Sequence, residues 1–348
     1  MPFEFVKLEA SEQPALREFL VNSSDEGATV TSFRSEVLTW KYFSRHPTWP
    51  EFRSFALKES GRIVAHGGIW PVRMQAARGT ELRAIQLIDW VASRSAVGAG
   101  VYLLRKIAGL ADLLINVGGS QDTLSVLPKL GYKRCGELQQ YARVVRPWLH
   151  FRTTPQKNWK VPMKLLRNLT RTLATNAPVP EGWTAEKVTA FPDALEPEIN
   201  GKVCHSTMSL RTVAELNHLL TCPAAKFSGY LVREKEQLRG FFLLAAIGHQ
   251  ARIVDVRLIG NERGSWPAMC NLAASTAAVD PNIAEVTAAS SVASVQQAWS
   301  NPGFLRRQTD KIFSLDPRAL IPPNQPIDLS LADSDLCIVT DPEFPYLL

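Results

Sequence analysis

Long apolar runs are absent from this 348-residue chain, and cysteines are few. No run of about 18 apolar residues occurs, so we expect no membrane-spanning helix. The five cysteines are scattered and odd in number, and none belongs to a CxxC motif, so we expect neither a disulfide framework nor a metal site. The N-terminal segment also lacks the basic and apolar series of a secretory signal, and we therefore expect a cytoplasmic protein.

Acidic residues are missing from one long segment. Between Leu138 and Pro180 the chain has no Asp or Glu but eight Lys or Arg residues. The net charge of +6 is therefore local, and we expect no DNA partner. Several prolines mark this segment as a linker, within which Lys160–Ala174 has the pattern of a basic amphipathic helix. The pattern leaves two readings open: a solvated connector, or a weak contact of residues 143–171 with an anionic partner or a membrane surface.

The stretch Leu87–Leu104 joins a predicted strand to a predicted helix through a glycine loop. Its loop contains Gly98 and Gly100, and Val101, Leu104 and Ala108 then recur at helical spacing. A helix start with bare backbone amides and a positive dipole end suits a phosphate or pyrophosphate. Glycine leaves the backbone accessible to such an anion, although many strand–helix turns carry glycine for turn geometry alone.

Further strands and helices surround this loop. We predict helices at Gln13–Val21 and Glu36–Phe43, and a hairpin over residues 53–69 that turns at Gly61. A strand at Leu82–Val91 precedes the glycine loop. The remaining predictions are a strand at Ala111–Val117, a short helix that ends at Gly131, and the last strands over Arg134–Val145. The proline-rich tail after residue 316 is predicted to fold back onto the second half, with Asp333 and Asp335 solvated.

The chain also carries a long-period repeat. Val37–Pro47 aligns with Val213–Pro223 without gaps, and Ile88–Val91 aligns with Val254–Arg257. Two shorter matches keep the same order, with offsets between 166 and 176 residues. We therefore predict two copies of one α/β unit. The predicted bounds are 1–147 for the first domain, 148–180 for a basic linker and 181–348 for the second domain.

The order of these elements resembles the GNAT superfamily of acyl-CoA-dependent N-acyltransferases, strongly over residues 30–145 and more weakly over 185–316. The resemblance implies an α/β (α+β) fold of two tandem domains, each a central mixed sheet flanked by helices. It also implies a transferase that moves an acyl group, acetyl above all, from coenzyme A to the amine of a small molecule or peptide. The cofactor would be acetyl-CoA or another acyl-CoA, held in the first copy. The second copy has Arg263-Gly264-Ser265 where the phosphate loop belongs, so no cofactor is expected there.

In the family, the glycine loop grips the pyrophosphate, and the pantetheine arm runs between two splayed parallel strands. Carried over to this chain, the resemblance implies the following cofactor-binding residues: Trp90, Val91, Ser95, Val97, Gly98, Ala99, Gly100, Val101, Tyr102 and Asn116. Ser95 stands where the family has Arg or Gln, with Arg94 one residue early. Leu127 stands where the family often has a tyrosine that acts as general acid, and Tyr132 and Tyr141 are distant alternatives.

Amine acylation needs a proton acceptor, and we consider Asp89 and His66 as catalytic candidates. Asp89 lies in an apolar strand where burial is expected to raise its pKa, although a purely structural role is the alternative. His66 lies beside Gly67-Gly68, and an unperturbed imidazole suits a general base. Trp40 and Tyr42 are predicted to line the acceptor pocket, with a core role as the alternative.

Two other functions remain open. A FemAB-like aminoacyltransferase of cell-envelope synthesis would use the basic linker to hold the phosphates of an aminoacyl-tRNA. A catalytically inactive GNAT pair that serves as a ligand sensor or scaffold would explain Leu127 and the altered second loop. The oligomeric state is not predicted.

Overall fold

The structure is a computed structural model of the whole chain. It describes residues 3–23, 31–76, 79–155, 160–174, 178–200, 207–260, 263–300, 303–322, 325–340 and 345–347. Within these ranges, no helix is long and apolar enough to cross a membrane.

The first half alternates helices and strands around the predicted glycine loop. Its elements are β1 (Glu4–Lys7), η1 (Ala10–Glu12), α1 (Gln13–Ser23), η3 (Thr31–Phe33), α2 (Ser35–Leu38), the π-helical η4 (Thr39–Phe43), β2 (Ser54–Glu59), β3 (Arg62–Gln75), β4 (Glu81–Ala92), α3 (Ala99–Ala108), β5 (Leu113–Val117), α4 (Gln121–Val126), η5 (Leu127–Leu130) and β6 (Lys133–Val144). Gly131 ends η5 with a φ of 89°, a left-handed conformation that glycine adopts without steric cost. Arg134–Val145, predicted to hold several last strands, forms one long strand instead.

The second half repeats this order after two linker helices. Its elements are α5 (Pro147–Thr153), α6 (Lys160–Ala174), β7 (Trp183–Val188), α7 (Leu195–Asn200), β8 (Thr207–Ser209), α8 (Val213–Leu220), β9 (Lys226–Glu234), β10 (Gln237–Ile247), β11 (Gln250–Leu258), η6 (Arg263–Ser265), α9 (Trp266–Ala277), β12 (Glu285–Ser290), α10 (Ala293–Trp299), β13 (Leu305–Leu315), β14 (Ile327–Asp328), η7 (Leu331–Asp333) and η8 (Asp335–Cys337). A capping box between Thr212 and Glu215 starts α8, the counterpart of α2 and η4. The repeat predicted from the sequence is confirmed in the order of its main helices and strands, although β8 of the second half has no strand counterpart among the described residues of the first.

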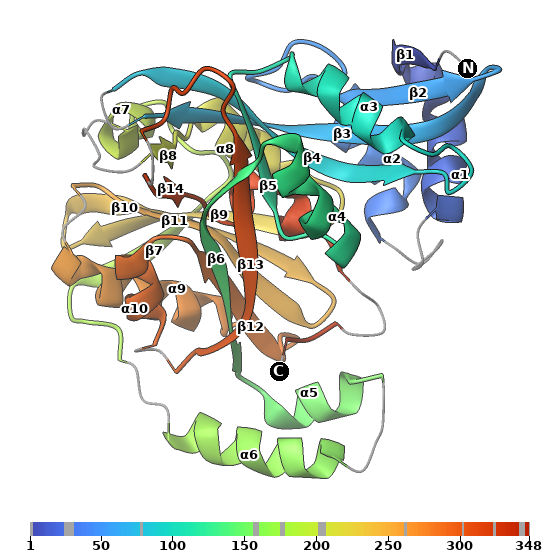
Figure 1. The fold of residues 1–348 in the computed structure, drawn as a ribbon. Coiled ribbons are helices and arrows are strands. Elements are labelled where there is room, and N and C mark those ends of the chain that lie inside the picture. Colours follow the sequence, from blue (N-terminus) through green and yellow to red (C-terminus); the bar gives the residue numbers. More distant parts are fainter. Residues whose placement is uncertain are drawn as a thin grey trace.

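One mixed sheet runs through both halves (Figure 1). Its main path has the order β1-β2-β3-β4-β5-β13-β6-β12-β11-β10-β9-β7. At its centre the halves exchange their last strands: β13 lies between β5 and β6, and β6 lies between β13 and β12. Each half therefore completes the sheet of the other. This shared sheet does not test the domain bounds expected from the sequence, which remain a prediction.

Helices cover both faces of the first half. On one face α3 packs against β2, β3 and β4 through Leu103, Leu104 and Ile107. On the other face lie α1, α2 and η4, whose Trp40 and Tyr42 join a core that continues into the second half. The sheet therefore separates the glycine loop and α3, on one face, from α1, α2 and η4 on the other.

The C-terminal tail packs between the halves rather than onto the second half alone. The Trp70 indole donates a hydrogen bond to the Ala332 carbonyl, and the Gln86 amide donates to the Ser334 hydroxyl. Asp333 and Asp335 are buried and form ion pairs, so the prediction that they are solvated is wrong. Their cationic partners, Arg211 and Lys41, lie far away along the chain, so no local pattern indicates these ion pairs.

Candidate functional site

Strands β4 and β5 separate in the middle of the sheet. Their parallel ladder has three residue pairs, ending at Gln86 and Ile115, whereas β4 continues to Ala92 and β5 to Val117. A bulge in β4 accompanies the separation, because His66 pairs with Val91 but Gly68 pairs with Ile88. Bulges bend a strand and are common beside active sites. The hydrogen-bonded ladder of these two parallel strands thus ends before the strands themselves do, and we call this separation the opening between β4 and β5.

Asp89 is the residue that forms the bulge. Its φ is 45°, a left-handed conformation in which a residue with a Cβ is strained. The second half repeats the feature, because the β10–β11 ladder shifts between Leu243 and Leu244 and leaves Val254 as the extra residue. The strands β11 and β12 likewise pair only as far as Ile253 and Ala288. Both halves thus contain a splayed strand pair next to a bulge.

The glycine loop ends at the start of α3, as predicted. Gly98 caps the helix with a φ of 81°, and a Cβ there would meet no atom within 4 Å. Val97 is 90% exposed, whereas Ala99 is buried in the core and anchors the first turn. The first-turn amides of such a helix lack carbonyl partners within it, and the positive dipole end lies at the same place. The Ala99 amide donates to the Ala96 carbonyl, and the loop at Gly98 is open to its surroundings.

The other predicted loop residues lie around this helix start. The Ser95 hydroxyl is 2.8 Å from that of Ser93, and Tyr102 is 41% exposed, with the Lys106 ammonium 5.4 Å from its ring centroid. The Trp90 indole donates to the Gly100 carbonyl over 3.1 Å, and a Cβ on Gly100 would lie 3.5 Å from that indole nitrogen. Trp90 therefore joins the bulge to the loop, in a contact that would also leave room for a Cβ at position 100.

Asn116 and Gly118 form the β5 side of the opening. Asn116 is 7% exposed, and its side-chain oxygen has no hydrogen-bond partner among the described residues. A buried acceptor without a partner costs free energy, so this atom is suited to a donor supplied by a ligand. Just beyond it, Asp310 of the exchanged strand β13 lies beside Gly118, where a Cβ would be 3.2 Å from the Asp310 Oδ1.

The side chain of Asp89 is enclosed by a buried ion cluster. Lys41 Nζ lies 2.7 Å from Asp89 Oδ2 and 3.0 Å from Asp335 Oδ2, and the Tyr42 hydroxyl donates to Asp89 Oδ2. Burial acts to raise the pKa of Asp89, but the Lys41 charge and the hydrogen bonds from Lys41 and Tyr42 hold that pKa below its ordinary value. The expectation of a raised pKa is therefore wrong. Lys41 compensates the carboxylate and makes Asp89 a weak base.

His66 is completely buried behind the bulge. Its Nδ1 donates to the Asp89 carbonyl over 3.0 Å, and its Nε2 lies 2.9 Å from the Ser54 hydroxyl, which must then be the donor. Burial lowers the pKa of His66 to about 4, so the ring is neutral near pH 7. The geometry gives His66 a clear structural task, which is to hold the bulged backbone.

Of the two predicted acceptor-pocket aromatics, the structure places Trp40 at a pocket and Tyr42 in the core. The pocket lies between the halves and has an empty volume of about 500 Å³, counting the part open to solvent. Trp40 stacks on the His218 ring with centroids 4.7 Å apart. The other lining residues include His46, Trp70, Arg73 and Glu215, from β3, α8 and the segment after η4. Tyr42 has no exposed surface and faces Asp89.

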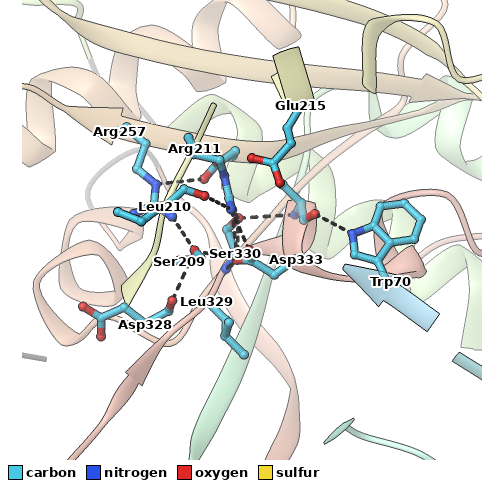
Figure 2. Close-up of polar contacts among 12 residues, drawn as sticks. Trp70, Ser209, Leu210, Arg211, Glu215, Arg257, Asp328, Leu329, Ser330 and Asp333 are labelled. Carbon is cyan, nitrogen blue, oxygen red and sulfur yellow. Dashed lines mark hydrogen bonds and ion pairs between the residues drawn. The ribbon is translucent and has the colours of Figure 1, made fainter. Parts of the chain in front are cut away.

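The second half has its own buried ion cluster. Arg211 forms ion pairs with Asp255, the counterpart of Asp89, and with Asp333 of the tail, 2.6 Å from its Oδ1. Figure 2 shows Arg211 directed at Asp333 and Ser330, with Ser209 and Arg257 beside them. Behind this cluster, a cavity with an empty volume of about 800 Å³ occupies the splay of β11 and β12 and is lined by Val256, Trp266, Ser290 and Leu329, among others.

Sequence reasoning missed two residues of the first-half site. Lys41 was hidden in an aromatic segment, although a lysine inside an otherwise buried helix signals a charged partner. Asp310 was assigned to the second domain, because nothing in the sequence reveals that β13 crosses into the first half. The exchange of last strands brings Asp310 to the end of β5.

Comparisons with known proteins agree with this architecture. No sequence family model matches the chain, and no curated protein matches it. An N-myristoyltransferase from Saccharomyces cerevisiae with bound myristoyl-CoA has a TM-score of 0.60 at 13% identity, over 92% of this chain and 85% of that one. A GCN5-related N-acetyltransferase from Anabaena variabilis has a TM-score of 0.59 at 13% identity, over 90% and 73% of the two chains.

A third similar structure has two units of its own. It is a tandem GNAT protein from the clavulanic acid biosynthesis pathway, with a TM-score of 0.55 at 12% identity, over 90% of this chain and 98% of that one. The chain has the GNAT fold. At these identities the likeness concerns the fold alone, and it confirms the fold class expected from the sequence.

Proposed function

We propose that the protein is an acyl-CoA-dependent N-acyltransferase with its cofactor site in the N-terminal half. The observation that carries the proposal is the opening between β4 and β5, which leads to the helix start at Gly98. A phosphate group needs the open amides of that loop, and an extended arm needs an opening between strands. Asn116 adds, on the wall of the same opening, a buried acceptor that has no hydrogen-bond partner in the described part of the chain.

In this proposal each predicted cofactor residue has a definite place. The pyrophosphate binds the backbone of residues 97–101, with Ser95 and Tyr102 at its edge. The pantetheine arm passes between Asn116 and the backbone of Asp89–Val91, with Trp90 beside it. Acetyl-CoA is the first donor to test, and longer acyl chains are the second, since one structural neighbour carries bound myristoyl-CoA.

We propose that the acceptor amine, on a small molecule or a peptide, enters through the pocket between the halves. Trp40 and Trp70 offer aromatic faces there, and Glu215 offers a carboxylate to a cationic amine. The pocket reaches Lys41, which also contacts Asp89 at the bulge. Tyr42 supports this wall from inside the core.

For the proton transfer we propose Asp310 rather than Asp89 or His66. Asp310 accepts hydrogen bonds from Gln140 over 2.6 Å and from Gln308 over 2.8 Å, both neutral donors. Asp89, by contrast, is compensated by Lys41, and His66 has no exposed surface. We therefore treat Asp89 and His66 as positioning residues that fix the bulge.

The four described cysteines are free thiols, which supports the expected cytoplasmic location.

Calorimetric titration with acetyl-CoA and with free coenzyme A tests the proposal. Micromolar binding to the native protein is expected, and Gly98→Asp should abolish it because a carboxylate would repel the pyrophosphate. Gly79→Asp is a matched control, since Gly79 has a φ of 85° and equally open surroundings in a distant turn. Absence of binding to the native protein would overturn the proposal and favour the tRNA-dependent or scaffold alternatives. Binding without transfer in an amine screen would favour the scaffold.

A further inference from the structure

The linker helix α6 packs on the protein through a face that contains the polar Asn168 and Thr172 beside the half-buried Leu165. Asn168 is buried, and the Thr172 hydroxyl donates to the Val144 carbonyl at the end of β6. An amphipathic helix on a globular protein ordinarily turns its apolar stripe toward the core. Here the apolar stripe is turned outward: Met163 is 64% exposed, Leu166 66% and Leu169 41%.

The neighbouring helix α5 extends this apolar surface. Trp148 on α5 is 61% exposed and stacks on Phe151, with ring centroids 5.5 Å apart. The two helices pack against each other and lie together at one end of the molecule, where α6 is the outermost element (Figure 1). Trp148, Met163, Leu166 and Leu169, which we call the α5–α6 apolar surface, are four of the seven large apolar side chains that are exposed in the described part of the chain.

Positive charge flanks this surface. Lys164 and Arg167 each follow a residue of the apolar stripe by one position, about 100° round the helix, and Arg171 lies four residues after Arg167 on the same side as Arg167. Arg307 of β13 lies within electrostatic range of Arg167 and Arg171. Burial and these two charges lower the pKa of Arg307. The whole stretch between Leu138 and Pro180 supplies no acidic residue to offset them.

We propose that helices α5 and α6 dock the protein on an anionic lipid bilayer, with the α5–α6 apolar surface inserted at the headgroup boundary. A helix that combines an exposed apolar stripe, flanking lysine and arginine, and a neighbouring tryptophan suits the membrane interface. Its cations meet the negative surface potential of anionic lipids, which adds to the burial of the stripe. This proposal is independent of the acyltransferase proposal.

Two other occupants fit the surface less well. A second copy of the chain would bring the arginines and lysine of two α6 helices together, with no acid in the helices to offset the repulsion. A nucleic acid would use the cations, but it would leave Met163, Leu166 and Leu169 without a role, because phosphate contacts do not need aliphatic side chains. The exposed apolar stripe is thus the feature that favours lipid.

Sedimentation of the full-length protein with vesicles tests the proposal. We expect roughly tenfold more protein bound to vesicles with about one third phosphatidylglycerol than to pure phosphatidylcholine vesicles. The double variant Met163→Ser with Leu166→Ser should lose this binding. Lys164→Glu with Arg171→Glu should lose it as well, and added salt should weaken binding of the native protein. Val279→Ser, which removes a 76% exposed apolar side chain outside helices α5 and α6, is the control and should bind as the native protein does.

Three results would overturn the proposal: equal partition to both vesicle types, anionic binding that survives the Met163/Leu166 double variant, or binding of a transfer-RNA probe without binding of vesicles. The circular dichroism of each variant shows whether it is folded. Titration of the same variants with acetyl-CoA is expected to be unchanged, because α6 lies away from the opening between β4 and β5. Failure of the lipid proposal is therefore distinguishable from failure of the acyltransferase proposal.

Discussion

Asp333 and Asp335, two residues apart in the C-terminal tail, complete the buried ion clusters of different halves. Asp333 pairs with Arg211 in the second half, and Asp335 pairs with Lys41 in the first. Each cation also holds the aspartate near its own bulge, Asp255 in one half and Asp89 in the other. The tail thus joins two equivalent sites through one short segment, and this duplication supports a structural role for both clusters.

Replacement of Lys41 by methionine should destabilise the protein strongly. The change leaves Asp89 and Asp335 buried without a cation, and a broken buried pair costs about 3–5 kcal/mol. The free energy of unfolding, measured with urea, should fall by that amount. Lys7→Met is the control, because Lys7 and Glu51 form an exposed pair whose loss should cost less than about 1 kcal/mol. Equal effects of the two changes would contradict the buried-cluster interpretation.

Stability should fall as the pH is lowered from about 6.5 to about 4. His66 has a pKa of about 4 in the folded protein against 6.5 as the ordinary value, so the unfolded chain binds the extra proton across this range. For this residue the loss is about 1.4 kcal/mol per pH unit, complete near pH 4. Urea unfolding between pH 7 and pH 4 measures it. His66→Gln should reduce the slope, and an unchanged slope in that variant would contradict the assignment of this loss to His66.

Most local elements could be predicted from the sequence, because they depend on neighbouring residues. The strand and glycine loop over Leu87–Leu104, the hairpin turning at Gly61 and the repeat of residues 37–47 in 213–223 are all confirmed. These features follow from hydrophobic periodicity and turn chemistry, which act over a few residues. The GNAT fold class followed from their order.

Long-range relationships could not be predicted in the same way. The exchange of β6 and β13 leaves no local mark, because a strand has the same alternation whichever neighbour it pairs with. The compensation of Asp89 by Lys41 joins residues 48 positions apart, and that of Arg211 by Asp333 joins residues 122 apart. Burial alone suggested a raised pKa for Asp89. Lys41, which the sequence analysis did not identify as its partner, lowers that pKa instead.

Replacement of Asn116 by leucine should separate cofactor binding from stability. The change removes a buried oxygen that has no partner among the described residues, so stability without ligand should be unchanged or slightly higher. Affinity for acetyl-CoA should fall roughly tenfold, because the ligand loses one hydrogen bond. Asn271→Leu is the control for affinity: its oxygen also has no partner among the described residues, but it lies on α9 of the second half, where its amide nitrogen donates to the Pro178 carbonyl. A normal affinity in Asn116→Leu would remove Asn116 from the site.

Replacement of Asp310 by asparagine tests the assignment of the proton acceptor. The amide keeps the size of the side chain but cannot take a proton, so kcat for the acceptor found in the amine screen should fall by roughly 10²- to 10³-fold. The affinity for acetyl-CoA and the unfolding midpoint should stay close to those of the native protein, since the contacts of Asp310 are to two glutamines near the surface. Asp89→Asn is the contrasting variant: it should lower stability first, because Lys41 loses a buried partner. If Asp310→Asn retained full kcat with an unchanged pH profile, the acceptor of the amine proton would have to be sought in the pocket that contains Glu215 and His218.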